Sequence, residues 1–273
     1  MKPSALFSVI TVSKQNLEGL KRTHHSLESQ SFRDFEWLVI DGASTDGTQD
    51  FLKTTTAKWS SEKDDGPFDA MNVGIKHARG DYLLFLNAGD VLAKPETLEK
   101  IAKIITEKQP DFIYGDSLET GNNAQPFYKA AGRYKDLPKG MFTHHQAMFY
   151  RLKNIRENDL WYSVIYEIAS DYEFTAKFLK NAKKIVYAPL PVCVFESGGL
   201  SQKRARTGRR EEFMIRDSMK MTGMAENVTI FALQTLAWNA RRWFPGLYEK
   251  AKKPKDPQNS SGQSLEESHK NNG

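Results

Sequence analysis

The strongest constraint on the fold is an alternation between short apolar runs and segments of helical periodicity, which extends from residue 6 to residue 116. The first run, 6–12, is short, uncharged and rich in β-branched residues, which predicts a buried strand. Strands that alternate with helices favour a parallel sheet covered by helices, so we predict an α/β fold. The predicted strands are 6–12, 35–40, 81–86 and 111–116, and the predicted helices are 17–27, 66–78 and 95–108.

The second half of the chain is less regular. Residues 117–165 contain one predicted strand, at 146–151. A helix is predicted at 170–182, with Ser170 or Asp171 as its N-cap. Two short strands at 184–189 and 192–196 and two helices at 203–222 and 226–243 complete the prediction.

Composition limits the class of protein. A chain of 273 residues, 39% of them hydrophobic, can form one large domain, or one domain with an appendage. Its single cysteine, Cys193, excludes an internal disulfide and a cysteine-rich zinc site, and suits a reducing compartment. The first strand begins within six residues, so no signal peptide is expected, and no apolar run approaches the roughly 18 residues of a membrane span. These features together predict a cytoplasmic protein.

Carboxylates follow the predicted strands where the strands end. Asp41, Asp90 and Asp116 each lie at or just past a carboxyl end, which is where open α/β sheets bind ligands. In the run 85–90, "FLNAGD", Asp90 stands among small residues and can take Mg²⁺ or Mn²⁺ together with substrate phosphates. Asn87 could orient a sugar or a metal-bound water. The alternative interpretation of this run is a solvated turn.

Two further segments combine polar side chains with small neighbours. Asp41 stands beside Gly42, where the backbone can approach a flat ligand, and a carboxylate there can accept the N3–H of uracil. The alternative is a tight turn in which Asp46 caps the following helix. Asp69 and Asn72 lie three residues apart on one helix face and can orient a nucleotide, although an ordinary amphipathic helix ending at Gly80 explains this segment better when it is taken alone.

In this order, the motifs resemble the family-two inverting glycosyltransferases of the GT-A fold. The similarity covers about residues 6–201, and within the family it is closest to bacterial exopolysaccharide transferases of the colanic-acid type. The matching segments are "VITV" (9–12), "IDGASTDGT" (40–48), "DAMNVGIKHARGDYLLFLNAGD" (69–90), "HHQAMFYR" (144–151), "SDYEF" (170–174) and "GGLS" (198–201).

The resemblance implies a GT-A domain at 1–201, with a mixed, mostly parallel sheet, a nucleotide-sugar half at 1–116 and an acceptor half at 117–201. Asp90 would bind Mn²⁺ or Mg²⁺. The family often has Asp where this chain has Asn87, so we expect weak binding of free metal and a cation that arrives with the sugar nucleotide. The donor-binding residues implied by the resemblance are Thr11, Val12, Asp41, Asp69, Asn72, Asn87 and Gly89.

The resemblance also implies that Asp171 is the catalytic base. An inverting transfer needs one base for the acceptor hydroxyl, worth roughly 10²–10⁴-fold, and stabilisation of the departing diphosphate, which a metal supplies. The alternative role of Asp171 is helix capping. Adjacent histidines on a strand point to opposite faces, so His144 and His145 do not form one metal site. His145 would contact the acceptor or the diphosphate, unless it is a structural, half-buried histidine.

The C-terminal part is basic and aromatic. The run 201–210 carries five cationic side chains, which would meet the diphosphate, an anionic acceptor or solvent. The segment 226–255 mixes aromatic and cationic residues and suits peripheral contact with an anionic membrane, although it could instead pack on the domain. We predict a helical extension at 202–250 and a disordered tail at 251–273. No nucleic-acid motif accompanies the cations, so no nucleic-acid partner is expected.

The expected function is a metal-dependent, inverting glycosyltransferase of the hexosyltransferase type. It would move a sugar from a nucleotide-diphosphate sugar, a UDP-sugar rather than a guanosine one, to a glycan or lipid-diphosphate-linked acceptor. The setting would be bacterial exopolysaccharide or surface polysaccharide synthesis on the inner face of the membrane. The alternative is a transferase-like, non-catalytic scaffold. A sugar-phosphate nucleotidyltransferase and a dinucleotide oxidoreductase are disfavoured, because no glycine-rich loop follows the first strand.

Overall fold

The structure, a computed structural model, describes residues 5–120, 126–196 and 198–243. The predicted disordered tail, 251–273, and the end of the basic, aromatic segment, 244–255, lie outside the described residues. The chain divides into two compact units, Met1–Phe231 and Ala232–Gly273. Of the second unit, the described residues are 232–243, the C-terminal part of one helix.

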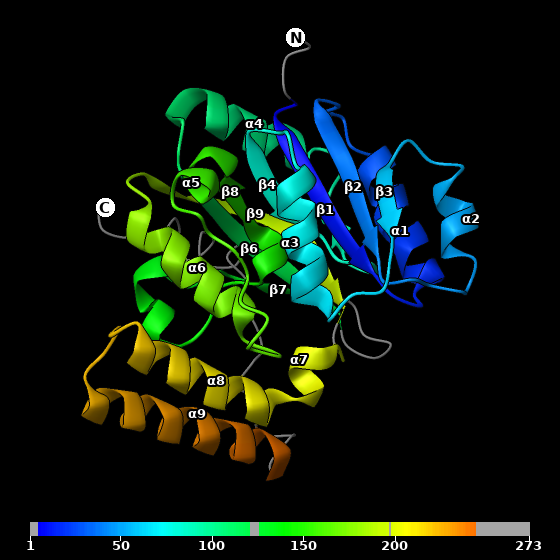
Figure 1. The fold of residues 1–273 in the computed structure, drawn as a ribbon. Helices are drawn as coiled ribbons and strands as arrows, with labels where there is room; N and C mark the ends of the chain where they lie inside the picture. Colours follow the sequence, from blue (N-terminus) through cyan, green and yellow to red (C-terminus); the bar gives the residue numbers. More distant parts are fainter. Residues whose placement is uncertain (1–4, 121–125, 197, 244–273) are drawn as a thin grey trace, which may run out of the picture. The chain divides into compact units, whose positions relative to one another are not determined.

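The first unit is an α/β domain built on one mixed sheet (Figure 1). Within the described residues the strand order is β3-β2-β1-β4-β8-β6-β9-β5, and β7 pairs with β6. The strands are β1 Phe7–Ser13, β2 Phe35–Asp41, β3 Lys58–Ser61, β4 Tyr82–Phe85, β5 Val91–Leu92, β6 Phe112–Thr120, β7 Phe127–Lys129, β8 Met148–Arg151 and β9 Ile185–Glu196. The helices are α1 Leu17–Glu28, α2 Thr48–Leu52, α3 Pro67–His77, α4 Thr97–Lys108, α5 Leu152–Glu157, α6 Ser170–Asn181, α7 Leu200–Lys203, α8 Ala205–Ser218 and α9 Met224–Trp243, with 3₁₀ turns η1 Tyr134–Lys139 and η2 His145–Ala147.

The predicted parallel sheet is confirmed for the first half of the chain. Strands β3, β2, β1 and β4 are mutually parallel, and β1 and β2 stay in register from Phe7 opposite Phe35 to Ser13 opposite Asp41. Strand β8 then enters between β4 and β6 and is antiparallel to both. The two short strands predicted at 184–189 and 192–196 are one strand, β9, whose register against β6 shifts beside Pro189 and Pro191. Proline lacks the N–H that a sheet ladder needs, which accounts for the irregularity.

The core lies on both faces of the sheet, because alternate residues of each central strand point to opposite sides. One apolar cluster contains Ile10 and Phe85 together with residues of α3 and α6. The other contains Val9 and Leu84 with residues of α1 and α4. Fully burying each large apolar side chain contributes about 1.5–3 kcal/mol, so this double layer stabilises the sheet that carries the site.

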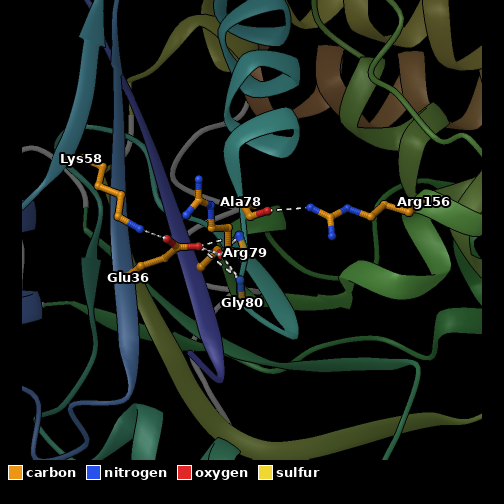
Figure 2. Close-up of polar contacts among 7 residues, drawn as sticks. Glu36, Lys58, Ala78, Arg79, Gly80 and Arg156 are labelled. Carbon is orange, nitrogen blue, oxygen red and sulfur yellow. Dashed lines mark hydrogen bonds and ion pairs between the residues drawn. The ribbon is translucent and has the colours of Figure 1, made fainter. Parts of the chain in front are cut away.

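Glu36 of β2 fixes the turn between α3 and β4 (Figure 2). Its carboxylate accepts the backbone N–H groups of Arg79 and Gly80 at 2.6 and 3.2 Å, the hydroxyl of Ser8 at 2.6 Å and the ammonium of Lys58 at 2.6 Å. A Cβ atom on Gly80 would lie 2.6 Å from backbone atoms of β1, so only glycine permits this approach. Four donors on one carboxylate therefore fix the entry into β4.

The same turn is held from the other side by α5. The guanidinium of Arg156 donates to the carbonyl oxygen of Ala78, at 2.7 Å, just past the end of α3 (Figure 2). A cation at the C-terminus of a helix satisfies an orphan carbonyl and complements the helix dipole. The start of β4, and so the position of the segment that follows it, is fixed by two elements that are distant in sequence.

Candidate active site

The segment after β4 forms a rigid turn. Ladder hydrogen bonds continue past the strand, from the N–H of Leu86 to Ile10 and from the N–H of Ala88 to the carbonyl of Val12. Gly89 has φ of 110°, a left-handed conformation that favours glycine, and its N–H donates to the hydroxyl of Thr23 at 3.0 Å. Val12 and Gly89, two of the donor-binding residues that the resemblance implies, thus both form hydrogen bonds at this turn.

Asp90 is nearly buried at the end of this turn, with 7% of its surface exposed. The side-chain amide of Gln146, in η2, donates to its Oδ2 at 2.7 Å. Burial and then the negative charge of Asp90 raise the pKa of Cys193 well above its ordinary value, so this thiol stays protonated. The partner of Asp90 comes from 56 residues away and was missed by the sequence analysis, although Gln146 lies in one of the motifs quoted there.

His145 connects the turn to Asp171. The amide nitrogen of Asn87 lies 3.4 Å from His145 Nε2, and His145 Nδ1 lies 3.4 Å from Asp171 Oδ2. The other amide atom, Asn87 Oδ1, is buried without a hydrogen-bond partner among the described residues. Three residues, from the turn after β4, from η2 and from α6, therefore form one polar chain beside Asp90.

Asp171 is not the cap of α6, nor is Ser170. The N-cap residue is Ala169, without a side-chain capping bond, and both candidates lie inside the first turn. The carboxylate of Glu211 in α8 instead accepts the N–H groups of residues 167, 168 and 169 at 2.8–2.9 Å. Among the described residues, the partners of the Asp171 carboxylate are the N–H of Tyr172, at 2.8 Å, and the imidazole of His145, and the side chain of Asp171 is 22% exposed. The structure therefore contradicts the capping interpretation and leaves Asp171 for another role.

His144 and His145 contact different partners, as predicted, but not because they lie on opposite faces of a strand. They begin the 3₁₀ turn η2 rather than lying on a strand. His144 Nδ1 is 2.9 Å from the hydroxyl of Ser117, and its ring stacks on Phe195. His145 alone belongs to the polar chain that contains Asp171.

A divalent cation fits this site only with help from a substrate. Within residues 5–120, 126–196 and 198–243 no group of three or more His, Cys, Asp or Glu side chains is arranged to hold a metal. Asp90 supplies one carboxylate, and the neighbouring amide oxygens Asn87 Oδ1 and Gln146 Oε1 are buried without partners in this part of the chain. An all-oxygen set with one carboxylate suits Mg²⁺ or Mn²⁺ when phosphate oxygens complete the coordination.

Asp41 is held in a different way. It is fully buried at the end of β2, and it accepts the N–H and hydroxyl of Ser44 at 2.9 and 2.5 Å and the hydroxyl of Ser61 at 2.6 Å. The neighbouring strand carries Thr11, which is also buried and accepts the indole N–H of Trp37 at 3.0 Å. These contacts tie Asp41 and Thr11 to the sheet rather than to the polar chain.

The two helical candidates also have partners of their own. Asp69 accepts the N–H of Asp65 at 3.3 Å, in the turn before α3. Asn72 exchanges two hydrogen bonds with the backbone of Tyr162, at 2.8 and 2.9 Å. The structure thus brings Asn87, Asp90, His145 and Asp171 together, whereas Asp41, Asp69 and Asn72 contact other segments.

Comparison with known proteins decides the family. Residues 8–169 match the family model described as Glycosyl transferase family 2. The chain belongs to glycosyltransferase family 2. The predicted enzyme class is thereby confirmed, whereas the colanic-acid type stays a prediction.

Two curated relatives illustrate the range of the family. A PGL/p-HBAD biosynthesis glycosyltransferase of Mycobacterium bovis is 31% identical over 208 residues, which cover 72% of this glycosyltransferase and 79% of the relative. The poly(ribitol-phosphate) beta-N-acetylglucosaminyltransferase TarS of Staphylococcus aureus is 27% identical over 191 residues, 66% of this chain and 33% of TarS.

Solved structures confirm the predicted fold class. TarS 1–349 in complex with UDP-GlcNAc aligns with a TM-score of 0.66 at 22% identity, over 96% of this glycosyltransferase and 77% of that chain. The mannosyltransferase PcManGT of Pyrobaculum calidifontis, in complex with GDP-Man and Mn²⁺, aligns with a TM-score of 0.62 at 15% identity, over 88% and 75%. At these identities the likeness shows the fold, a mixed sheet flanked by helices.

Proposed function

We propose that this glycosyltransferase moves a sugar, with inversion, from a UDP-sugar to a hydroxyl group of a glycan acceptor, in the presence of Mn²⁺ or Mg²⁺. The observation that carries the proposal is the polar chain Asn87–His145–Asp171, which lies next to the Gln146–Asp90 contact. The partly exposed carboxylate of Asp171 and the buried carboxylate of Asp90 thus contact two adjacent residues of η2.

In this proposal Asp171 is the general base. It takes the proton of the acceptor hydroxyl while the oxygen attacks the anomeric carbon and the nucleoside diphosphate leaves, a contribution worth about 10²–10⁴-fold. Its freedom from capping supports this role, because Glu211 satisfies the preceding N–H groups instead. Asp90 would hold the cation, which as a Lewis acid offsets the charge that develops on the diphosphate.

For the nucleotide we propose uridine, and we propose that Asp41 contacts its uracil ring. The neighbour TarS binds UDP-GlcNAc, whereas PcManGT binds GDP-Man, so a guanosine donor is the alternative to test. Asp41 accepts hydrogen bonds from Ser44 and Ser61 within the protein, so contact with uracil N3–H would exchange or add to a serine donor. Thr11, Asp69 and Asn72 would complete the donor site. Their hydrogen bonds to Trp37, Asp65 and Tyr162 hold the segments that would surround the nucleotide.

We further propose a lipid-diphosphate-linked acceptor and peripheral contact with the inner face of the membrane, in exopolysaccharide or surface polysaccharide synthesis. No described helix has the length and apolar character to cross a bilayer. The C-terminal part of α9 supports interfacial contact, because Leu233, Leu236 and Trp243 lie on one helix face and are 61%, 64% and 69% exposed. The N-terminal part of α9 packs instead on α8, through Asn227 and Arg216 at 2.7 Å.

A donor screen tests the function. The melting point is measured with each of a panel of nucleotide sugars and Mn²⁺, and it should rise with one UDP-sugar. At a hundredfold excess over Kd, that ligand adds about 2.7 kcal/mol to the free energy of unfolding. That donor should then support transfer to an acceptor sugar, and the Asp90→Ala variant should lose this transfer activity. Wild-type turnover in Asp90→Ala would contradict the metal assignment, and no response to any nucleotide sugar would favour the scaffold alternative.

Vesicle flotation tests the membrane proposal. The triple variant Leu233→Ser, Leu236→Ser and Trp243→Ser keeps the full chain and should float less than wild type with vesicles of anionic lipid. A matched variant with Met224→Ser and Val228→Ser, also exposed on α9, is the control for general loss of apolar surface. Equal flotation of the wild type and the triple variant would remove this proposal.

A further inference from the structure

The imidazole of His145 lies between an amide and a carboxylate, which restricts where its proton can be. Asn87 presents its amide nitrogen to Nε2 at 3.4 Å, and Asp171 presents Oδ2 to Nδ1 at 3.4 Å. An amide nitrogen only donates, and a carboxylate only accepts. A neutral imidazole satisfies both neighbours only when Nε2 accepts and Nδ1 carries the proton.

We propose that His145 is a positioning residue for Asp171, held in the Nδ1–H tautomer by Asn87 so that it donates to the carboxylate. The inference rests on the proposed function of Asp171 as the base. The second carboxylate oxygen, Oδ1, accepts the N–H of Tyr172 at 2.8 Å. One donor on each oxygen fixes the plane of the carboxylate and leaves its remaining lone pairs for an acceptor hydroxyl.

The surroundings of Asp171 fit a carboxylate that is oriented rather than paired with a cation. Tyr150 and Tyr162 are near enough for its charge to act on them: burial, with a smaller contribution from the charge of Asp171, raises the pKa of both phenols. These phenols therefore stay neutral. Tyr150 bonds to Thr175 at 2.9 Å, so among these neighbours the imidazole is the group that contacts Oδ2.

Asn87 links the base to the donor side of the site. Its Oδ1 is buried without a partner among the described residues, so a hydroxyl of a bound sugar or a cation held with Asp90 would satisfy it and fix the amide with Nδ2 toward His145. An Asp at this position would have no N–H to offer. It would draw the imidazole proton to Nε2 and turn the Nδ1 lone pair toward Asp171. The amide is therefore part of the positioning device.

Two substitutions at position 145 separate the two ring nitrogens. The amide nitrogen of Asn reaches the place of Nδ1, whereas that of Gln reaches the place of Nε2. We expect His145→Asn to keep kcat within about threefold of wild type, and His145→Gln to lower kcat by about tenfold or more, with the donor KM nearly unchanged. His144 contacts Ser117 and Lys129 instead of Asp171. The control variants His144→Asn and His144→Gln should therefore leave kcat unchanged.

A ring-nitrogen measurement by ¹⁵N NMR on histidine-labelled protein needs no activity. The His145 signals, assigned by their loss in His145→Asn, should show the proton on Nδ1, and Asn87→Ala should weaken that preference, since only the Asp171 carboxylate then favours it. If wild type transfers no sugar, the proposed function fails while the tautomer result stands. If transfer occurs but His145→Gln is the active variant, both variants lose activity equally, or the proton lies on Nε2, the positioning role is overturned.

Discussion

At the scale of single residues, the hydrogen bonds around each carboxylate separate a structural acid from a candidate catalytic one. Asp41 is fully buried and accepts three donors from two serines. Asp171 accepts one backbone N–H and an imidazole contact and is partly exposed. A carboxylate with three donors from the protein contributes to the fold whether or not it also contacts a ligand, whereas one with few protein donors has lone pairs left to act on an acceptor hydroxyl.

Asp41→Ala should therefore lower the free energy of unfolding by about 1–3 kcal/mol, because it leaves buried serine donors unpaired. Urea denaturation without ligand measures this change. Asp171→Asn is the matched comparison and should change stability by less than about 0.5 kcal/mol. Equal losses in the two variants would show that Asp171 is also structural.

Glu36 gives a prediction about pH. Burial raises the pKa of its carboxyl, but hydrogen bonds from Lys58, Ser8 and the backbone of Arg79 outweigh burial and hold the pKa below its ordinary value of 4.5. The ionised form is thus favoured in the folded state, so its contribution is present above about pH 4.5 and is lost as the pH falls through the lowered pKa.

Glu36→Gln should destabilise the protein by about 1–3 kcal/mol at pH 7. The difference from wild type should stay constant down to about pH 5.5 and narrow below pH 4.5. Denaturation series at several pH values measure it. A difference that widens on acidification would contradict the lowered pKa.

At the scale of elements, the start of α6 shows what sequence reasoning could and could not find. The helix itself followed from its periodicity, and its start was predicted at the residue where the structure begins it. The capping group could not be predicted, because Glu211 reaches residues 167–169 from another helix, 42–44 positions away in the chain. Local preferences favoured Ser170 or Asp171, and tertiary contact replaced them.

Glu211→Gln should lower the melting point and also reduce kcat, because the segment that precedes Asp171 loses its carboxylate acceptor. We expect a loss of about 1–2 kcal/mol in stability, as for other capping groups. Thermal melting and transfer assays measure the two effects. Glu226→Gln, an exposed change in α9, is the control, and an unchanged kcat in Glu211→Gln would show that the start of α6 is held by packing alone.

At the scale of the whole molecule, the sequence predicted the sheet well only where connections are regular. Strands that are joined through helices tend to run parallel in one sheet, which is why the parallel arrangement of β1, β2 and β4 was predictable. The antiparallel entry of β8 between β4 and β6 follows from no local pattern, because the sequence of residues 117–165 shows no regular alternation of strands and helices. That entry brings His145 and Gln146 to the turn at Asn87 and Asp90, so the site depended on the part of the topology that was hardest to predict.

The most direct test of the account is donor binding and transfer measured side by side on Asp171→Asn. Binding of the UDP-sugar with Mn²⁺, followed by calorimetry, should stay within about threefold of wild type, since the proposal has Asp171 act on the acceptor hydroxyl and not on the donor. Transfer should fall by about 10²–10⁴-fold, the contribution of a general base. Transfer at the wild-type rate, or loss of binding and transfer in equal measure, would contradict the assignment of Asp171 as the base.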